Sequence, residues 1–318
     1  MANPLFRCRS LAALAVFALV PLVGCTASEL AAPPATATAP GSDQCIAPTD
    51  EFAKLECTFQ ARLGVYALDT GTNHAVNFRA EERFPFASTS KALLAAIVLQ
   101  TTSDEELNQE VRYTSADLID YSPITERNIT PDRRATSMTL RDLCDAAIRY
   151  SDNTASNLLF RHIGGPAAFQ AELRKNGDEV TLSERTEPEL NTAIPGETRD
   201  TSTPQTLALH LKRFSLDESV LSTERRGLFN SWLKGNTTGN KLIRAGIPAG
   251  WTVGDKTGSA DYGTRNDIAV IWPDSGGAPI VMVVLSTRST YDAKKDDKLI
   301  ADATKVAFNE IIRKRGER

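Results

Sequence analysis

Segments of strand composition lie near both ends of this chain, and the long part between them has helical patterning. Two pairs of strands are predicted around turns, residues 62–68 with 75–79 and residues 267–272 with 279–286. A closing helix is expected over residues 294–313. This order predicts an antiparallel sheet built from N- and C-terminal segments, with flanking helices and an inserted helical lobe.

The predicted arrangement sets approximate boundaries. We expect an α/β lobe at about 48–83 and 235–318, and an all-α lobe at about 84–234. Together they form one domain, residues 48–318, which is at the upper end of single-domain size.

Four short polar motifs follow one another within this domain. They are Ser88-Thr-Ser-Lys91, Ser151-Asp-Asn153, Glu187-Pro-Glu-Leu-Asn191 and Lys256-Thr-Gly258. Between them they contain a nucleophile, candidate bases, a proton relay and an anion site, which acyl transfer through a serine ester requires. Each motif is weak alone, but the set favours an enzyme.

The first motif precedes an apolar run, residues 92–99, that has no Gly, Pro or charge and predicts a buried helix. Ser88 and Lys91 would then lie one turn apart on one face, where a partly desolvated Lys can act as a base toward the hydroxyl. The alternative is a helix-terminal Ser followed by an exposed Lys. The same spacing recurs at Ser231-Trp-Leu-Lys234 without this context.

The second motif, Ser151-Asp-Asn153, is expected in a short connection between amphipathic stretches at 139–150 and 155–162. Ser151 would pass a proton to a leaving nitrogen, and Asn153 would bind a substrate carbonyl. These residue types also cap helices, and the two roles are compatible.

The third motif lies in residues 183–204, which lack a helical or strand period and predict a long surface loop. Arg185 and Asp200 would close this loop with an ion pair. Glu187 would then polarise a water molecule that Asn191 also contacts. Two other carboxylates of the loop, Glu189 and Glu197, are expected to be solvated.

The fourth motif ends a strand predicted over residues 251–259. Its small residues, Gly258 and Ser259, let a substrate lie against the backbone, so the N–H groups of Ser88 and Ser259 would form an oxyanion hole. The hydroxyls of Thr257 and Ser259, with Lys256 and Arg265 nearby, would bind a carboxylate. In isolation this motif is simply an edge strand bearing a Lys.

From about Asp50 to the C-terminus, the chain resembles the class A serine β-lactamases, because the family's four motifs all occur here in the family's order. The resemblance implies a site in the cleft between the two lobes. It also implies hydrolysis of the β-lactam amide of penicillins and cephalosporins through a Ser88 acyl-enzyme, and hence antibiotic resistance. Lys91 and Glu187 are the candidates for activating Ser88, and Glu187 would be the deacylating base.

Three further features follow from the resemblance. Tyr121 matches an aromatic wall beside the substrate, with a half-buried loop Tyr as the alternative. Arg265 matches a position where some members bind the substrate carboxylate, with a surface Arg as the alternative. The family often has a cis peptide at the position of Glu187-Pro188.

Two disulfides of the family are absent from this sequence. One would pair Cys144 with the position of Ala95, and the other, found in carbapenem-hydrolysing members, would join the positions of Ala87 and Ala260. Efficient carbapenem turnover is therefore not implied by the resemblance.

Two other functions would use the same nucleophile. A D,D-peptidase would be acylated by peptidoglycan peptides and released slowly from β-lactams, but the Glu187 loop argues against it. A covalent β-lactam sensor would signal without turnover, and it would need a signalling or transmembrane domain that we do not expect in this chain.

No metal or cofactor is expected. The three His residues, His74, His162 and His210, are scattered without ligand spacing, which argues against a zinc site and a Ser-His-Asp triad. A net charge of -4 with scattered basic residues is not typical of nucleic-acid binding. We expect a monomer whose partner is the small-molecule β-lactam.

The N-terminus has the pattern of an export signal. Arg7 and Arg9 precede an apolar run, residues 11–23, that is too short to span a membrane. Leu22-Val-Gly-Cys25 resembles a bacterial lipobox, so cleavage before Cys25 and lipidation of its thiol would anchor the protein outside the cell membrane. Ordinary secretion is the alternative. We expect a signal peptide at 1–24 and a lipidated flexible tether at 25–47.

Five Cys residues occur in the sequence, and three would remain available in an oxidising exterior once Cys8 is removed with the signal and Cys25 is lipidated. Cys45 and Cys57 can pair only if the tether folds back along the first helix. Cys144 is expected to be a small buried hydrophobic residue. The odd number of thiols predicts that one stays free.

Overall fold

The computed structural model describes residues 49–129 and 135–317. The chain divides into two units, Met1–Ala35 and Thr36–Arg318, and all described residues belong to the second. The predicted signal peptide at 1–24, the tether at 25–47 and the lipid site at Cys25 lie outside the described residues. No helix among the described residues is long and apolar enough to cross a membrane.

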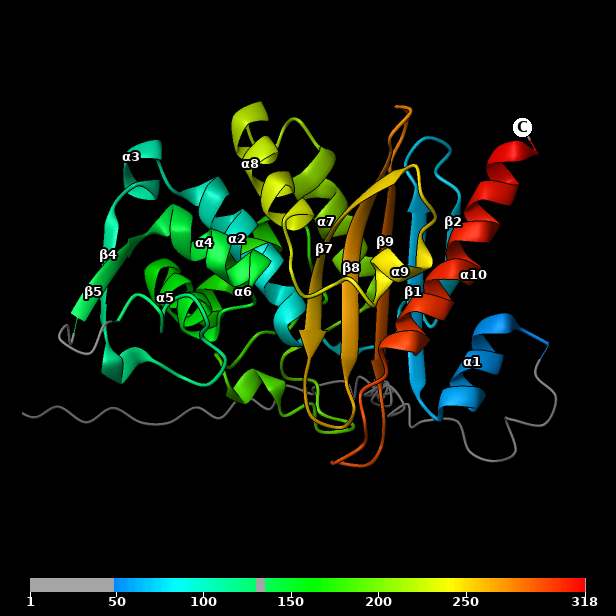
Figure 1. Ribbon diagram of the computed structural model, residues 1–318, viewed down its shortest axis with the longest axis horizontal. Helices are drawn as coiled ribbons and strands as arrows, with labels where there is room; N and C mark the ends of the chain where they lie inside the picture. The colour runs from blue at the N-terminus through cyan, green and yellow to red at the C-terminus, as the bar shows by residue number, and fades with distance from the viewer. Residues whose placement is uncertain (1–48, 130–134, 318) are drawn as a thin grey trace, which may run out of the picture. The chain divides into compact units, whose positions relative to one another are not determined.

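A five-stranded antiparallel sheet forms the centre of the α/β lobe, in the order β2-β1-β9-β8-β7 (Figure 1). The strands are β1 (Arg62–Asp69), β2 (Ala75–Phe78), β7 (Trp251–Ser259), β8 (Arg265–Pro273) and β9 (Ile280–Thr287). The pairing of β1 with β9 runs from Arg62 opposite Thr287 to Asp69 opposite Ile280. The prediction of one sheet built from both ends of the chain is therefore confirmed.

Both faces of this sheet are covered, because all eight residues of β1 are buried. Leu63, Val65 and Ala67 belong to a core that they share with α10 (Asp297–Gly316) and α1 (Glu51–Phe59). Tyr66 and Leu68 point to the opposite face, where α7 (Pro204–Leu216) packs on β1, β8 and β9. The short α9 (Ile243–Gly246) lies against α10.

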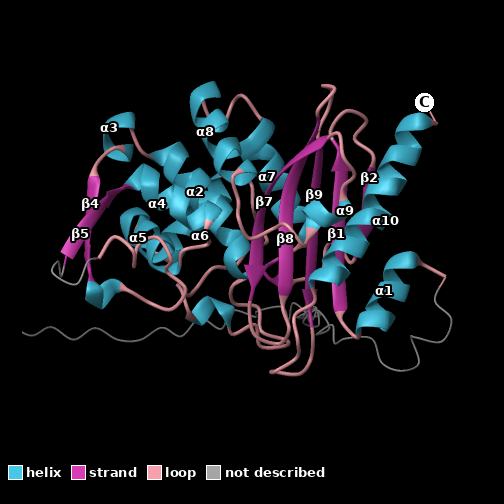
Figure 2. Ribbon diagram, viewed as in Figure 1, coloured by secondary structure: helices cyan, strands magenta, loops and turns pink. Residues whose placement is uncertain are grey.

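The inserted segment is mainly helical, as predicted (Figure 2). Its helices are α2 (Ser90–Thr101), α3 (Asp104–Leu107), α4 (Leu140–Arg149), α5 (Asn153–Ile163), α6 (Pro166–Lys175) and α8 (Thr223–Lys234). The helix α2 is buried from Ser90 to Leu99 and contacts α4, α5, α6, α7 and α8. The apolar run at 92–99 therefore forms the central helix of this lobe.

Short elements that the sequence analysis did not predict complete the fold. Two small antiparallel pairs form between β3 (Phe84–Pro85) and β6 (Thr201–Ser202), and between β4 (Glu110–Thr114) and β5 (Ala135–Thr139). A 3-10 turn, η3, covers Ser115–Asp117. The closing helix begins three residues later than predicted, because the Asp296 carboxylate caps it by accepting the N–H of Lys298 and Leu299.

The cysteines follow the sequence analysis where the structure describes them. Cys144 is free and completely buried on α4, and burial raises the pKa of its thiol. Cys57 is disulfide-bonded. The sequence analysis left open whether Cys57 pairs with Cys45, and Cys45 lies outside the described part of the chain.

Candidate active site

The turn that carries Ser88 is held firmly against the sheet. Ser88 lies in the 3-10 turn η2 (Ala87–Thr89), directly before α2, so it precedes the α-helix instead of opening it. The Asn266 amide of β8 donates to the Pro85 carbonyl oxygen at 2.7 Å. On β7, a Cβ added to Gly258 would lie 3.0 Å from the Phe86 carbonyl oxygen. Glycine at 258 therefore allows the close approach that positions the serine.

Lys91 is fully buried one turn after Ser88, and its amino group contacts residues of the first three motifs. Its Nζ lies 2.8 Å from Ser88 Oγ and 2.7 Å from Glu187 Oε1. It also donates to Asn153 Oδ1 at 2.5 Å and to the Ser151 carbonyl oxygen at 3.1 Å. The buried amino group of Lys91 is therefore surrounded by hydrogen-bond acceptors, as a buried polar group requires.

Glu187 contacts both Ser88 and Lys91. Ser88 Oγ is 3.3 Å from Glu187 Oε1, and the Asn191 amide donates to Glu187 Oε2. The Glu187 side chain, like that of Lys91, is 0% exposed. The hydroxyl therefore contacts two groups that can take its proton, which is the arrangement of an activated nucleophile.

Ser151 connects Lys91 to the fourth motif. The Lys256 Nζ donates to Ser151 Oγ at 2.9 Å and to the Thr257 carbonyl oxygen at 2.8 Å. Lys256 is 0% exposed, and its burial, together with the positive charge of Lys91, lowers its pKa well below the usual value. Ser151 has a left-handed backbone with φ of 58°, which is uncommon for a non-glycine residue and typical of functional sites.

The residues of the predicted carboxylate site lie on the paired strands β7 and β8. The hydroxyls of Thr257 and Thr238 lie 2.6 Å apart, and Ser259 is opposite Arg265 in the β7–β8 pairing. Arg265 already has a partner that the sequence analysis did not predict, because its Nε lies 2.6 Å from Asp297 Oδ1. The carboxylate of Asp297, the first residue of α10, therefore orients the Arg265 guanidinium.

Tyr121 is exposed, with 61% of its surface accessible, and has a left-handed φ of 61°. Its carbonyl oxygen accepts the Asn153 N–H at 3.0 Å, and the Asn153 side chain donates to the Asp120 carbonyl oxygen at 2.9 Å. The loop that carries the tyrosine is therefore fixed to the second motif. The ring is not the half-buried loop residue considered as the alternative.

The Glu187 loop is closed by the predicted ion pair, with Arg185 Nε 2.5 Å from Asp200 Oδ2. Glu197 is not solvated as expected, because its carboxylate lies 3.0 Å from Arg185 Nη2. Glu189 is exposed, and the Glu187-Pro188 peptide is cis, both as predicted. The loop also contains the 3-10 turn η4 (Glu189–Asn191) and the strand β6.

Asn157 is a functional candidate that the sequence analysis missed. Its side-chain oxygen accepts the Glu187 N–H at 3.0 Å, and its amide donates to the Glu187 carbonyl oxygen at 2.8 Å. Because Asn157 lies one helical turn after Asn153 on α5, the spacing of two asparagines was the available signal. Asn157 orients the backbone of the residue that faces Ser88.

We expect Asn157→Ala to slow turnover without preventing folding. Two hydrogen bonds to the Glu187 backbone are lost, each worth about 0.5–1.5 kcal/mol, so the rate should fall about 5- to 100-fold. Steady-state hydrolysis rates and unfolding midpoints would measure both effects. Asn230→Ala, which removes a similar bond to the Ser215 carbonyl oxygen, is the control, and an equal rate loss in both variants would contradict the positioning role.

Two buried carboxyl groups, those of Asp255 and Asp267, lie close to Lys256. Asp255 is held by Arg244 Nε and Asn236 Nδ2, both at 2.5 Å, and Asp267 accepts the Ile243 N–H at 3.0 Å. Burial and the neighbouring Asp255 raise the pKa of Asp267 well above the usual carboxyl value. The folded protein therefore keeps Asp267 protonated over a pH range in which the unfolded chain ionises it.

This difference predicts a pH dependence of stability. The contribution of Asp267 is complete below its unfolded pKa of about 4 and is lost as the pH rises through its raised folded pKa. Asp267→Asn cannot ionise, so its free energy of unfolding should gain on that of the wild type as the pH rises above about 4. Denaturant unfolding across the pH range tests this, with the exposed Asp274→Asn as control. Parallel pH profiles for wild type and Asp267→Asn would refute it.

The twelve residues predicted to act in catalysis or substrate binding are all described, and those of the four motifs meet where β7, η2, α5 and the Glu187 loop converge. No group of three or more His, Cys, Asp or Glu within residues 49–129 and 135–317 is placed to hold a metal ion. An acyl-transfer site that relies on Lys and Glu, at the junction of an α/β lobe and a helical lobe, is that of an active-site serine hydrolase.

Comparisons with known proteins identify the family. Residues 47–311 match the model described as the Beta-lactamase enzyme family, and the chain belongs to this family. It is 51% identical to a β-lactamase of Bacillus licheniformis over 96% of each chain. It is 54% identical to a β-lactamase of Amycolatopsis lactamdurans over 82% of this chain and 84% of the relative.

Solved structures agree with this assignment. The crystal structure of a halotolerant bacterial β-lactamase superposes with a TM-score of 0.79 at 49% identity, covering 83% of this chain and 99% of that one. A class A β-lactamase from Clostridium kluyveri gives a TM-score of 0.78 at 47% identity, covering 82% of this chain and 97% of the other. The predicted two-lobe fold is confirmed.

Proposed function

We propose that this protein hydrolyses the β-lactam amide of penicillins and cephalosporins through an ester on Ser88, and thereby gives antibiotic resistance. One observation carries the proposal. Ser88 Oγ lies 2.8 Å from Nζ of the fully buried Lys91 and 3.3 Å from Oε1 of the buried Glu187, and these two atoms are themselves 2.7 Å apart. This arrangement supplies a base for forming the ester and a base for hydrolysing it.

Acylation begins when Ser88 Oγ attacks the β-lactam carbonyl carbon. The proton of the hydroxyl passes to Lys91 or to Glu187, both of which are in contact with it. The carbonyl oxygen becomes an oxyanion that the N–H groups of Ser88 and Ser259 stabilise. The substrate carboxylate binds to Thr257, Ser259 and Arg265, with Lys256 behind them.

Ring opening requires a proton on the departing nitrogen. The Ser151 hydroxyl gives up that proton, because it accepts from Lys256 at 2.9 Å and lies 3.5 Å from Lys91. The C–N bond breaks as Ser151 recovers a proton from the lysines. Asn153 offers the substrate's carbonyl the amide N–H that does not donate to the Asp120 carbonyl oxygen, and Tyr121 forms the aromatic wall.

Deacylation uses a water molecule held by Glu187 and Asn191. Glu187 takes a proton from the water as the water oxygen attacks the ester carbonyl carbon, and it passes this proton to Ser88 Oγ as the C–O bond to the serine breaks. Asn157 and the Arg185–Asp200 ion pair keep Glu187 in place for this step. A protein acylated on serine without such a base would bind β-lactams and stop.

The time course of chromogenic cephalosporin opening tests the proposal. Sustained turnover well beyond one equivalent of enzyme is the expected result. A burst that stops near one equivalent would contradict the proposed deacylation and favour a covalent sensor or a D,D-peptidase. Release of D-alanine from peptidoglycan-like peptides separates these last two.

We also propose that the protein is exported and anchored at the cell membrane through a lipid on Cys25, as a monomer, and possesses no nucleic-acid partner. The lipobox-like Leu22-Val-Gly-Cys25 supports the anchor. Cys25→Ser should release activity from the membrane fraction into the soluble fraction. Unchanged fractionation of this variant would contradict lipidation.

A further inference from the structure

Thr257, one of the residues proposed to bind the substrate carboxylate, is also part of a hydrogen-bond chain that leads into the protein. Its hydroxyl lies 2.6 Å from that of Thr238, in the loop between α8 and α9. The Thr238 hydroxyl lies 2.9 Å from Asn236 Oδ1, and Asn236 Nδ2 donates to Asp255 at 2.5 Å. Each hydroxyl has a single proton, so the direction of one bond in the chain determines the direction of the next.

The orientation of the Asn236 amide is fixed from both ends. The Thr238 N–H donates to Asn236 Oδ1 at 3.1 Å, and a backbone N–H can only donate, so the atom facing it must be the amide oxygen. The amide nitrogen then points to the carboxyl group of Asp255, which is 0% exposed. The loop can lie this close to Asp255 because residue 239 is a glycine, at which an added Cβ would collide with Asp255 Oδ2.

This orientation assigns the protons of the two threonines. Asn236 Oδ1 can only accept, so the Thr238 hydroxyl gives its proton to that oxygen. The Thr238 oxygen is therefore the acceptor in the contact with Thr257, and the Thr257 hydroxyl is the donor. The opposite assignment would leave the Thr238 and Asn236 oxygens 2.9 Å apart with no proton between them. Within the described residues, Thr238 is the one hydrogen-bond partner of the Thr257 hydroxyl.

The assigned direction is unfavourable for binding a carboxylate at Thr257. A hydroxyl whose proton is directed at Thr238 has only lone pairs for another group, and a carboxylate also has only lone pairs to offer. The Thr257 hydroxyl must therefore rotate before it can donate to the substrate. This rotation breaks its hydrogen bond to Thr238, which reduces the net gain from the new bond.

We propose that Thr238 is a positioning residue that sets the affinity for the substrate carboxylate, because its hydroxyl oxygen competes with that carboxylate for the proton of Thr257. The competition weakens the binding of β-lactams that carry the carboxylate and has no effect on compounds that lack it. The inference rests on the proposed function, since it requires the carboxylate to bind at Thr257.

The second-order rate constant for β-lactam ring opening tests the proposal, because it depends on binding and acylation and not on deacylation. Thr238→Val keeps the shape of the side chain and the N–H that holds Asn236, but it removes the competing acceptor. The rate constant for a penicillin should rise about 2- to 10-fold, since one neutral hydrogen bond no longer has to be broken. For the same penicillin with hydrogen in place of the carboxylate, the variant should react like the wild type.

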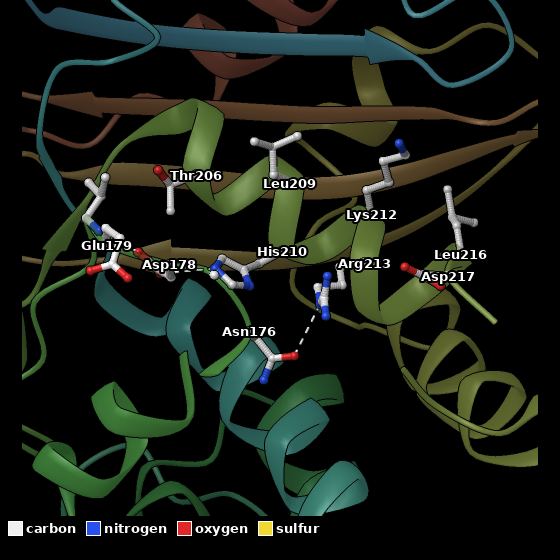
Figure 3. A pocket seen from close by; sticks show the side chains of 12 residues that line it. Asn176, Asp178, Glu179, Thr206, Leu209, His210, Lys212, Arg213, Leu216 and Asp217 are labelled. Carbon is white, nitrogen blue, oxygen red and sulfur yellow. Dashed lines mark hydrogen bonds and ion pairs between the residues drawn. The ribbon is translucent and has the colours of Figure 1, made fainter. Parts of the chain in front are cut away.

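Two further variants separate this effect from a general change in structure. Thr238→Ser keeps the hydroxyl and should react like the wild type. Thr206→Val makes the same chemical change at another pair of threonine hydroxyls, in which Thr203 donates to Thr206 at 2.8 Å. Figure 3 shows Thr206 on α7 at a cavity whose described lining residues belong to none of the four motifs, so this variant should also react like the wild type.

Two kinetic results would overturn the proposal. One is a rate constant for the penicillin that is unchanged or lower in Thr238→Val. The other is an equal rise for the penicillin and for the compound without the carboxylate, which would show that the substitution acts on the site as a whole.

The Thr257 proton can also be observed directly, which separates a failure of this inference from a failure of the proposed function. In protein labelled with carbon-13 and nitrogen-15 threonine, the Thr257 hydroxyl proton should exchange slowly with water, and Thr238→Val should accelerate this exchange. Fast exchange in the wild type, or exchange that the substitution leaves unchanged, would overturn the inference even if β-lactams are hydrolysed. If the wild type opened no β-lactam, the proposed function would fail, whereas slow exchange would still show that Thr238 accepts this proton.

Discussion

The Glu187→Gln variant is expected to be acylated on Ser88 by one substrate molecule and then to remain in this acyl-enzyme form. The glutamine keeps the size of the side chain but cannot accept a proton from water, and general base catalysis contributes about 10²–10⁴-fold. Steady-state hydrolysis should fall by about this factor, whereas acylation should be retained if Lys91 can activate Ser88. Mass spectrometry of the protein after mixing with substrate should show one covalently bound equivalent.

Glu189→Gln is the matched control for this experiment. It makes the same chemical change two residues away, at an exposed side chain. This variant should turn over like the wild type. If Glu187→Gln showed no adduct and no burst, Glu187 would be required for acylation as well, and the activation of Ser88 would belong to it and not to Lys91.

Lys91→Met is expected to lose acylation itself. The variant removes an ammonium group that contacts Ser88, Glu187, Asn153 and Ser151 while keeping most of the stem volume. The loss of base and charge should lower the acylation rate about 10²–10⁴-fold. The rate of adduct formation in the Glu187→Gln background would isolate this step from deacylation.

The same variant should be less stable, because Glu187 stays buried without its cation. Removing one partner of a buried ion pair costs about 3–5 kcal/mol, unless the remaining carboxyl group takes up a proton. Denaturant unfolding would measure this loss separately from the kinetics. Lys234→Met, in the other Ser-x-x-Lys sequence, is the control, and a comparable loss of acylation there would contradict the role assigned to Lys91.

The two Ser-x-x-Lys sequences show how far the sequence was informative. Residues 92–99 are apolar, and the helix they form buries Lys91 completely. Ser231 and Lys234 are both exposed on α8, where Ser231 Oγ donates to the Leu228 carbonyl oxygen. The apolar residues that follow Lys91 distinguished the two sequences. The burial of a lysine depends on the whole helix that carries it, and the composition of a helix predicts whether it is buried.

The strands and motif positions were predictable for the same reason, but the partners of individual charges were not. The Arg265–Asp297 pair joins residues 32 positions apart, so it depends on how separate segments pack, and the Arg185–Glu197 pair depends on how the Glu187 loop folds on itself. Asn157 was missed because its two bonds go to backbone atoms, which leave no trace in the sequence of the Glu187 loop. Local patterns do not encode such long-range contacts.

The pairing of β1 with β9 has a consequence for how the protein is made. A ribosome completes β1 and Ser88 long before it reaches Lys256, Asn266 and the strands that hold the serine in place. The sheet can close only after the C-terminal strands have emerged, so the order of synthesis cannot be the order of folding for this lobe. A truncated chain would carry the nucleophile without the hydrogen bond from Lys256 to Ser151 and without the bond from Asn266 to Pro85, and the complete site is therefore confined to full-length molecules.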